Sequence, residues 1–250
     1  MNTHAEDVQQ GLWPVKHGVV ASVPQHCRVG QSVRLYGEWL EQELELLGRV
    51  VAAGHTVLEF GGDYGVQTLW LARAVGEQGT VHVAEPRRLH AQTAAANLAL
   101  NAIDNGHVHP FWLGRAGGML WLEDSGASHD AGVDQRVRSQ ALDQLPLAAL
   151  HLLKINFPGA LGAVLHGGGD VLRRLRPVVY FRLGQRAEAA TQDIATLKAH
   201  GYRCWSHLPY LYSPTNHAGS QQNIFPGWVS RNIIAAPVEQ GRVFDSLSEV

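Results

Sequence analysis

Short apolar runs alternate with amphipathic stretches along most of this 250-residue chain. Apolar runs of this length, bounded by turn residues, are typical of buried strands, whereas apolar positions three or four residues apart indicate helices. The pattern predicts strands over residues 56–60, 80–84, 107–112, 150–156, 177–183, 202–208 and 229–236. It predicts helices over residues 37–53, 66–75, 87–101, 160–175 and 187–200. Such alternation implies parallel strand pairing with helices on both faces of one sheet.

The expected organisation is a lead over residues 1–35 with short strands, followed by one domain over 36–250. Residues 18–21 have strand character within this lead. The alternation breaks between residues 114 and 145, where 119–122 resembles a short strand. A second irregular stretch, residues 209–227, joins the last two strands and is long for a compact domain. Loops of this length are often lids or binding loops.

Composition fits a globular protein, with 45% hydrophobic residues. We find no apolar run of the roughly 18 residues that a membrane span needs. The polar, acidic start at residues 1–10 does not resemble a secretory signal, so a soluble cytoplasmic protein without a membrane partner is expected. A formal net charge of −2 argues against a nucleic-acid partner.

Cysteine and histidine do not indicate a metal site. Cys27 and Cys204 match no zinc spacing, and we expect reduced thiols. The chain has 14 histidines, of which His107 and His109 share one face of a predicted strand. Scattered surface and core positions explain this number better than a ligand set, and no metal is predicted.

A glycine-rich turn follows the first strand of the predicted domain. The sequence there is Val-Leu-Glu-Phe-Gly-Gly-Asp-Tyr-Gly over residues 57–65. Glycines allow tight turns and close approach of a ligand, and the next helix presents free N–H groups. Ligands of open α/β sheets bind at the carboxyl ends of the strands. Glu85, twenty residues beyond Gly65, ends the second strand and can accept hydrogen bonds from both hydroxyls of a ribose.

The spacing of the glycines distinguishes two cofactor classes. A dinucleotide site requires G-x-G-x-x-G, which Gly61, Gly62 and Gly65 do not match. An acidic residue followed by G-x-x-x-G instead indicates S-adenosylmethionine (SAM), with S-adenosylhomocysteine (SAH) as the product. Glu59 and Asp63 are expected to help place the cationic amine of SAM. The expected cofactor-binding residues are Glu59, Gly61, Gly62, Asp63, Gly65, Thr68, Glu85 and Pro86.

From residue 36 to 237 the sequence resembles the FkbM-type methyltransferases. The resemblance rests on Tyr-Gly-Glu-Trp at 36–39, the glycine turn, Ala-Glu-Pro at 84–86 and Asn-Leu-Ala-Leu-Asn at 97–101. It continues in Ala-Leu-Asp-Gln-Leu at 141–145, Leu-Lys-Ile at 153–155, Gly159, Arg-Pro-Val-Val-Tyr at 176–180 and the long loop. It implies a Rossmann-like class I methyltransferase fold whose sheet is mostly parallel with an antiparallel last strand. It also implies O-methylation of a small molecule, glycan or secondary metabolite.

The chain departs from this family at its acidic centre. Where the family has Lys-Ile-Asp-Val-Glu-Gly-x-Glu, this chain has Asn156, Pro158 and Leu161 at the acidic positions. It also has Arg182 where the family tends to have Glu. Asparagine cannot act as a general base, and proline and leucine have no polar side-chain group.

Three functions therefore remain open. The first is methyl transfer to oxygen, or to an amine that needs little general-base help. The expected catalytic residues are Asp143, Lys154, Asn156 and His207. Asn156 would orient the acceptor, or it could instead cap the following helix. The second function is a SAM-binding partner or scaffold without catalysis, and the third is a dinucleotide-dependent oxidoreductase. The acceptor and the oligomeric state are not indicated, although aromatic residues over 205–228 could line an acceptor pocket.

Overall fold

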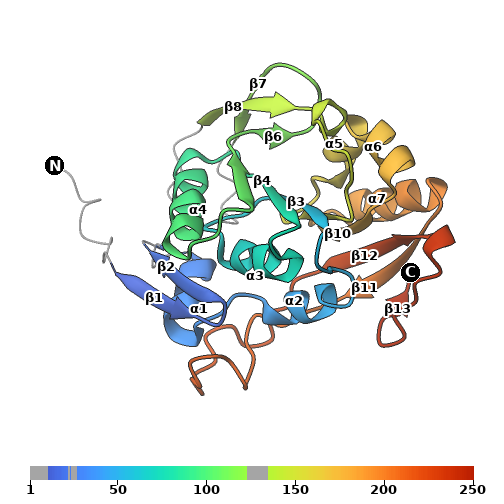
Figure 1. The fold of residues 1–250 in the computed structure, drawn as a ribbon. Coiled ribbons are helices and arrows are strands. Elements are labelled where there is room, and N and C mark those ends of the chain that lie inside the picture. The colour runs from blue at the N-terminus through green and yellow to red at the C-terminus, as the bar shows by residue number, and fades with distance from the viewer. Residues whose placement is uncertain (1–10, 22, 24–26, 123–134) are drawn as a thin grey trace.

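The computed structural model describes residues 11–21, 23, 27–122 and 135–250 (Figure 1). Parts of the predicted lead and of the irregular stretch over 114–145 lie outside these residues. The centre is an eight-stranded sheet of order β13-β11-β12-β10-β9-β3-β4-β5. Its strands are β3 (Thr56–Phe60), β4 (Thr80–Ala84), β5 (Gly106–His109), β9 (Leu152–Ile155), β10 (Val178–Arg182), β11 (Tyr202–His207), β12 (Asn232–Pro237) and β13 (Ser248–Glu249).

Five neighbouring strands, β10, β9, β3, β4 and β5, are parallel to one another. β12 runs antiparallel between β10 and β11. This confirms the predicted α/β fold with a mostly parallel sheet and an antiparallel last long strand. The chain order reverses between β3 and β9, because β4 and β5 extend to one side and β10 to the other. Such a switch point is where open α/β sheets bind ligands.

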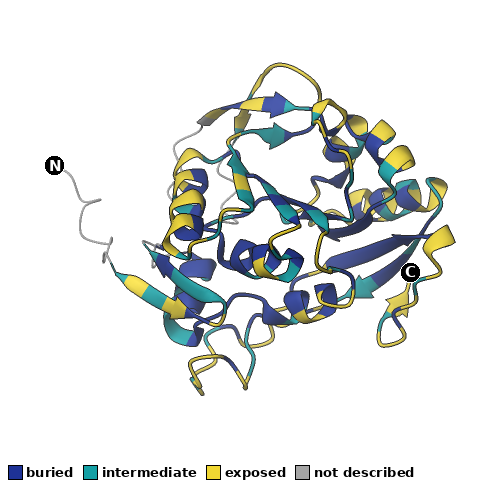
Figure 2. Ribbon diagram, viewed as in Figure 1, coloured by how far each residue is buried: buried dark blue, intermediate teal, exposed yellow. Residues whose placement is uncertain are grey.

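Helices cover both faces of the sheet, so most residues of its central strands are buried (Figure 2). Leu46 and Leu47 of α2, with Leu71 and Val75 of α3, pack against one face. The opposite face is covered by α5, α6 and α7. The helices of the two layers are α2 (Glu41–Leu47), α3 (Val66–Val75), α4 (Arg88–Leu100), α5 (Leu161–His166), α6 (Gly169–Leu175) and α7 (Ala187–Ala199).

The segment before the sheet forms a hairpin, whose second strand confirms the strand character predicted at residues 18–21, and a helix that the sequence pattern did not predict. The hairpin pairs β1 (Leu12–Val15) with β2 (Gly18–Ala21), and the helix is α1 (Arg28–Tyr36). The α1 sequence contains Gly30 and Ser32, which are weak helix formers. Burial stabilises it instead, because Val33 and Tyr36 pack in one core with residues of α3 and α4. The boundary after residue 35 stays a prediction.

The helix predicted over 37–53 is much shorter in the structure, and the prediction of its length was wrong. Gly37 ends α1 in the left-handed conformation at φ 65°, and Leu40 is also left-handed at φ 50°. Two such residues prevent a helix from starting at 37. The predicted helix over 160–175 is likewise divided into α5 and α6. The two helices meet at Gly167, where the backbone passes close to Gly114. An added Cβ at Gly167 would lie 2.0 Å from the carbonyl oxygen of Gly114, so this position requires glycine.

Beyond β5 the chain leaves the central sheet. Pro110 ends the strand predicted over 107–112, because proline has no N–H for the ladder. A small sheet follows, of order β6-β8-β7, made of β6 (Trp112–Leu113), β7 (Met119–Leu122) and β8 (Gln135–Gln140). The short strand predicted over 119–122 is confirmed by β7.

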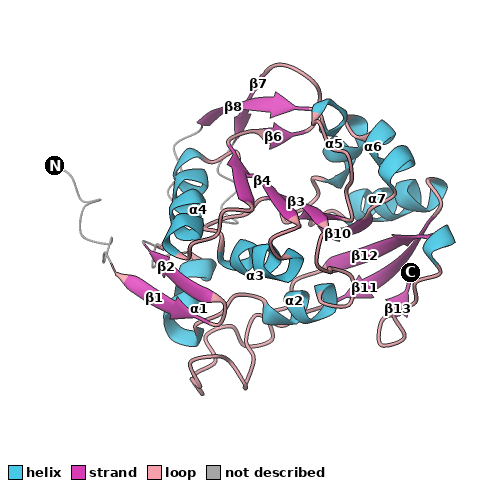
Figure 3. Ribbon diagram, viewed as in Figure 1, coloured by secondary structure: helices cyan, strands magenta, loops and turns pink. Residues whose placement is uncertain are grey.

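The long loop before β12 lies below α1 and α2 (Figure 3). Tyr36 fastens it at two points: its hydroxyl donates to the carbonyl of Gln222 at 2.9 Å and accepts from the amide of Ile224 at 2.8 Å. Glu38 accepts a further bond from the amide of His217. The loop is therefore tied to the segment around α1, and these bonds would have to break before it could move as a lid.

Candidate functional site

The residues at the carboxyl edge of the sheet form a row across the strands. Because Phe60, Ala84, Ile155 and Phe181 are in register, the positions that follow them are neighbours. Arg182 is in turn paired with Asn232, and Asn232 with His207. The row lies at the topological switch point and consists of Glu85, Gly61, Asn156, Arg182, Asn232 and His207.

The glycine turn after β3 is held tightly against its neighbours. Gly61 has φ 88°, and an added Cβ would lie 3.0 Å from the ring of Phe157. At Gly62 an added Cβ would lie 2.3 Å from Cγ1 of Val83. Both positions therefore require glycine, one for conformation and both for space. The turn leads into α3, whose N-cap is Gly65.

Glu59 and Thr68 support this turn from within the core. Both side chains are fully buried, and Thr68 donates its hydroxyl to Oε2 of Glu59 at 2.6 Å. The other oxygen of Glu59 accepts from Asn156 at 3.0 Å. Since both oxygens are bonded internally, Glu59 positions the turn, and the expectation that it contacts a ligand amine stays a prediction.

Glu85, at the end of β4, is bonded on both oxygens. It accepts from the amide of Asp63 at 3.0 Å and the amide of Arg87 at 3.0 Å. The Arg87 guanidinium adds a fork of two bonds, from Nε to Oε1 at 2.8 Å and from Nη2 to Oε2 at 2.7 Å. The same Nη2 lies 2.6 Å from Oδ1 of Asp63. Arg87 thus bridges the two acidic residues of the predicted cofactor site.

These charges stabilise one another electrostatically. Burial by itself lowers the pKa of Arg87, but Glu85 and Asp63 outweigh it and hold that pKa above its ordinary value. Burial raises the pKa of Asp63, but Arg87 outweighs this effect and keeps it below its usual range. Both groups are therefore ionised near neutral pH.

A cavity of about 590 Å³ opens at the ends of β4 and β5, where Pro86 and Pro110 line it. Its lining combines apolar side chains with arginines. The apolar lining residues are Pro86, Leu89, Pro110 and Val137, and the polar ones are Arg88, Gln92, Arg136 and Arg138. Pro86, a predicted cofactor residue, thus lies in the wall of this cavity, whereas the Glu85 side chain is fully buried and is not among the lining residues.

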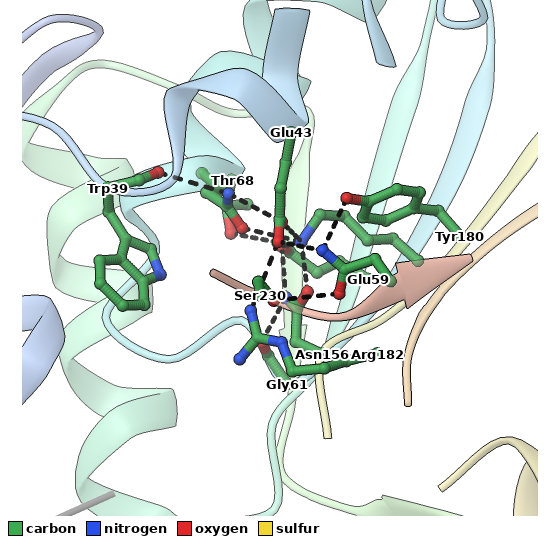
Figure 4. A network of polar contacts seen from close by, with 12 residues as sticks. Trp39, Glu43, Glu59, Gly61, Thr68, Asn156, Tyr180, Arg182 and Ser230 are labelled. Atoms are coloured by element: carbon green, nitrogen blue, oxygen red, sulfur yellow. Dashed lines mark hydrogen bonds and ion pairs between the residues drawn. The ribbon is translucent and has the colours of Figure 1, made fainter. Parts of the chain in front are cut away.

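Lys154, in the middle of β9, is the centre of a buried polar network. Figure 4 shows members of this network, among them Glu43, Glu59 and Asn156. The Nζ of Lys154 lies 3.3 Å from Glu59, 3.5 Å from Glu43 and 2.7 Å from Oε1 of Gln67. It also donates to Oδ1 of Asn156. Glu43 comes from α2, and Gln67 comes from α3. The side chains of Lys154 and Glu43 are completely buried, so their charges depend on this pairing.

Asn156 is satisfied within this network and does not cap a helix. Its Nδ2 donates to Glu59 and also to the carbonyl of Gly61 at 2.8 Å. The following helix α5 has Ala160 at its N-cap, without a side-chain cap. The capping interpretation was therefore wrong. Asn156 instead joins β9 to the turn after β3.

The network continues to His207. Asn232 donates to Glu43 at 3.0 Å and to the hydroxyl of Tyr180 at 2.9 Å, and that hydroxyl lies 2.8 Å from Nδ1 of His207. Burial raises the pKa of Tyr180 well above its ordinary value and lowers that of His207, so both are neutral at pH 7. Since Tyr180 accepts from Asn232, its own proton points to Nδ1 of His207. The ring proton of His207 is then on Nε2, which suits donation rather than proton removal.

The structure brings Lys154, Asn156 and His207 into one network, but not Asp143. Asp143 accepts hydrogen bonds from the amides of Asp170 at 3.2 Å and Val171 at 2.8 Å, at the start of α6. Its carboxylate stabilises that helix terminus. This engagement does not favour Asp143 as a base, and its predicted catalytic role has no support in these contacts.

Sequence reasoning missed Glu43, Gln67, Asn232, Arg87 and Arg182 as site residues. Glu43 lies in a predicted amphipathic helix, where a glutamate is expected to face the solvent. In the structure its side chain is fully buried. Its partners Lys154 and Asn232 are more than 100 residues away along the chain. Arg87 was within reach of a local signal, because it follows Glu85 by two residues at the end of a strand.

The aromatic residues considered for an acceptor pocket separate in the structure. Trp205 is buried in the core against Phe244, and Phe225 packs on Tyr36. Trp228 is half-exposed.

Within residues 11–21, 23, 27–122 and 135–250 we find no cluster of three potential metal ligands. The helices in the described part of the chain include none long and apolar enough to cross a membrane. Cys27 and Cys204 are both buried.

Comparison with known proteins places the fold. No family model and no curated protein matches the chain. A SAM-dependent O-methyltransferase from Thermotoga maritima is 12% identical, with 91% of this chain and 77% of that chain covered and a TM-score of 0.51. Methyltransferase FkbM from Methylobacillus flagellatus is 14% identical, with 83% and 54% covered and a TM-score of 0.48. An rRNA methylase from Streptococcus thermophilus is 13% identical, with 78% and 94% covered and a TM-score of 0.48. At these identities the likeness is one of fold, and this chain has the α/β fold of the Thermotoga protein.

Proposed function

We propose that the chain binds SAM at the carboxyl ends of β3 and β4 and transfers its methyl group to a small-molecule acceptor. The FkbM-type resemblance of the sequence favours oxygen as the methylated atom, and an amine is the alternative. In this proposal the cofactor-binding residues are those of the glycine turn with Glu85 and Pro86. Asn156 and Lys154 position the ends of β9 and β3, next to which the acceptor would meet the methyl group.

The observation that carries the proposal is the relation between Glu85 and the glycine turn. The carboxylate lies against the turn, because it accepts the amide of Asp63 at 3.0 Å. A ribose bonded to Glu85 would therefore lie directly beside Gly61 and Gly62. The cavity wall includes Pro86, the residue after Glu85, and Leu89, and these apolar side chains could contact a purine base. A dinucleotide site would need glycines spaced as G-x-G-x-x-G for its pyrophosphate, and Gly61, Gly62 and Gly65 do not have this spacing.

One observation favours the second candidate, a SAM-binding protein without catalysis. Asn156 has both side-chain groups committed to Glu59, Gly61 and Lys154, and His207 presents a donor. A base for an alcohol acceptor is therefore hard to find in this network. An acceptor that needs no base, such as an amine or a group already ionised, keeps methyl transfer feasible by placement alone.

Isothermal titration calorimetry with SAH and with NAD tests the cofactor. We expect SAH to bind and NAD not to bind. Glu85→Gln keeps the shape of the side chain but weakens acceptance from the ribose hydroxyls, and we expect a loss of about 1–3 kcal/mol in SAH binding. The melting temperature must be measured on the same variant. Unchanged SAH affinity in a folded Glu85→Gln variant, or preferential NAD binding, would overturn the assignment.

Turnover distinguishes methyl transfer from binding alone. A panel of phenols, amines, carboxylic acids and short RNA should be offered with labelled SAM, because the expectation that no nucleic acid binds stays a prediction. SAH formation above background with one acceptor class supports methyl transfer. Tight SAH binding without turnover across the panel supports the scaffold function instead. A cytoplasmic location stays a prediction.

A further inference from the structure

The charge and the hydrogen-bond donors of Arg182 are only partly paired with neighbouring groups. Its Nη2 lies 3.5 Å from Oε1 of Glu43, and its Nε is buried without a hydrogen-bond partner among the described residues. Glu43 is at the same time shared by Lys154, Gln67 and Asn232. One carboxylate therefore serves two cations, and the guanidinium of Arg182 keeps an unused donor at the carboxyl edge of the sheet. A buried N–H without an acceptor is costly, which indicates a site that a ligand completes.

Arg28 provides a second guanidinium within electrostatic range of Arg182. Arg28, the first residue of α1, stacks on Trp228 with its central carbon 4.1 Å from the ring centroid. Trp228 lies four residues before Asn232, which is the register partner of Arg182. Burial lowers the pKa of Arg28, and the charge of Arg182 lowers it further, so the two cations repel each other. Among the described residues, no ion pair of Arg28 with a carboxylate is found.

The place of these residues relative to the cofactor indicates which molecule they would meet. Glu85 fixes the proposed nucleoside at β4, and the reactive end of the cofactor then lies at the switch point between β3 and β9. Arg182 is on β10, on the opposite side of β9 from the glycine turn. Adjacent strands are about 4.8 Å apart, so Arg182 lies two strand spacings from β3, on the side from which an acceptor approaches.

We propose that Arg182 and Arg28, with Trp228 as a wall, form an oxyanion-binding subsite that selects acceptors bearing a carboxylate or phosphate group. This inference rests on the proposed methyl transfer, since it names the acceptor class for that site. A guanidinium presents planar paired donors that match carboxylate and phosphate oxygens, and the unused Nε of Arg182 is one such donor. An anion between the two arginines would also relieve their mutual repulsion.

The subsite explains why arginine is compatible with the rebuilt acidic centre. In the FkbM-type pattern position 182 tends to be Glu, which would repel an anionic acceptor. In this chain the same position presents a cation, while Asn156 replaces a carboxylate in the neighbouring strand. Both differences remove negative charge from the acceptor side of the site, in the direction that an anionic acceptor requires.

The proposal is tested by titrating benzoate, benzamide and inorganic phosphate into SAH-saturated protein. Calorimetry or NMR of the ligand measures the binding. Benzoate and benzamide have the same shape and differ in charge. We expect benzoate to bind at least about tenfold more tightly than benzamide. Arg182→Gln and Arg28→Gln should each abolish this preference, whereas Arg231→Gln, an exposed arginine beside β12, should keep it. Phosphate binding stronger than benzoate binding assigns the subsite to phosphorylated acceptors, and the reverse assigns it to carboxylates.

The controls separate this inference from the cofactor proposal. Arg182→Lys keeps the charge in case Arg182→Gln does not fold, and Arg28→Gln breaks no ion pair found among the described residues. Normal SAH binding with equal affinity for benzoate and benzamide, or with no binding of benzoate and phosphate, overturns the subsite alone. Absent SAH binding overturns the cofactor proposal, and the oxyanion titrations can then be repeated without SAH. If the variants lose SAH but keep 5′-methylthioadenosine, the arginines bind the carboxylate of the cofactor, and the acceptor subsite is refuted.

Discussion

The guanidinium of Arg87 forms a two-bond fork on the carboxylate of Glu85, with donor–acceptor distances of 2.8 and 2.7 Å. The fork uses the oxygens that a ribose would need. Cofactor binding must therefore replace these two bonds, and the fraction of molecules in which Glu85 is uncovered limits the apparent affinity. Arg87 thus acts as an internal competitor in the proposed cofactor site.

Arg87→Leu should strengthen SAH binding by about three- to tenfold, because the competitor is removed. The same change leaves Glu85 and Asp63 without their cation, so the ligand-free protein should melt at a lower temperature. Calorimetry with SAH and thermal unfolding measure the two effects. Arg115→Leu, an exposed arginine, is the matched control and should change neither. Weaker SAH binding in a folded Arg87→Leu variant would mean that Arg87 contacts the cofactor directly.

Lys154→Met should destabilise the protein by about 3–5 kcal/mol. The substitution keeps the length of the side chain but leaves Glu43 and Glu59 buried without their shared cation. Denaturant unfolding measures the loss. Lys198→Met, at an exposed position of α7, should stay within about 0.5 kcal/mol of the parent. Adding Glu59→Gln to Lys154→Met should recover part of the lost stability, since one unpaired buried charge disappears. If Lys154→Met alone loses no more stability than Lys198→Met, the buried network is not held by charge.

Asn156→Asp, which restores the family residue, should destabilise this chain by about 1–3 kcal/mol at pH 7. An ionised carboxylate cannot donate to Glu59 or to the carbonyl of Gly61, as the Asn156 amide does. Repulsion from Glu59 would raise the pKa of the new carboxyl in the folded state. A folded pKa above the unfolded value means that the penalty is present above the folded pKa and is relieved as pH falls through it.

The measurement for Asn156→Asp is the difference in unfolding free energy from the parent at pH 7 and pH 5. Asn156→Leu is the control, because it loses the same two donated hydrogen bonds, and also the bond from Lys154, without adding a titrating group, so its difference from the parent should stay constant. Equal behaviour of the two variants would contradict the repulsion argument. Turnover per folded molecule, measured on both variants, also tests whether Asn156 orients an acceptor.

The sequence predicted the parts of this fold that depend on local pattern. The strand over 56–60 and the helix over 66–75 have the predicted limits, because apolar runs, flanking glycines and helical spacing are local signals. The turn over 61–65 and the carboxylate of Glu85 come together as predicted. Their proximity follows from parallel neighbouring strands, which the alternation of elements already implied.

The parts that were not predicted depend on contacts between distant segments. Helix α1 is stabilised by burial against α3 and α4 rather than by helix propensity. The pairing of Glu43 with Lys154 and Asn232 joins three elements that no local pattern connects. The left-handed conformation of Leu40 is likewise imposed by packing, since leucine does not favour it. Candidate catalytic residues could be placed on strand ends, but their hydrogen-bond partners could not.

The last prediction concerns three histidines on the edge of the sheet, outside the proposed site. His82 on β4 lies with Nδ1 3.2 Å from Nε2 of His109 on β5, and its ring is also near that of His107. Burial, together with the charges of His109 and His107, lowers the pKa of His82 to about 4. The unfolded chain therefore binds a proton on this ring at a higher pH than the folded protein does. By linkage, the stability that a neutral His82 contributes is complete above about pH 6.5 and decreases as the pH falls toward 4.

His82→Phe should therefore flatten the acid side of the stability profile. Phenylalanine keeps an aromatic ring between β4 and β5 but cannot be protonated. Between pH 7 and pH 4.5 we expect the variant to lose about 1–2 kcal/mol less unfolding free energy than the parent, a figure reduced for the partial solvent exposure of these rings. Urea unfolding at half-unit pH steps measures both profiles. At pH 8 the two proteins should differ only by a pH-independent packing term. Parallel profiles from pH 8 to 4.5 would show that His82 titrates alike in the folded and unfolded chains, and the histidine contact would then contribute nothing to acid sensitivity.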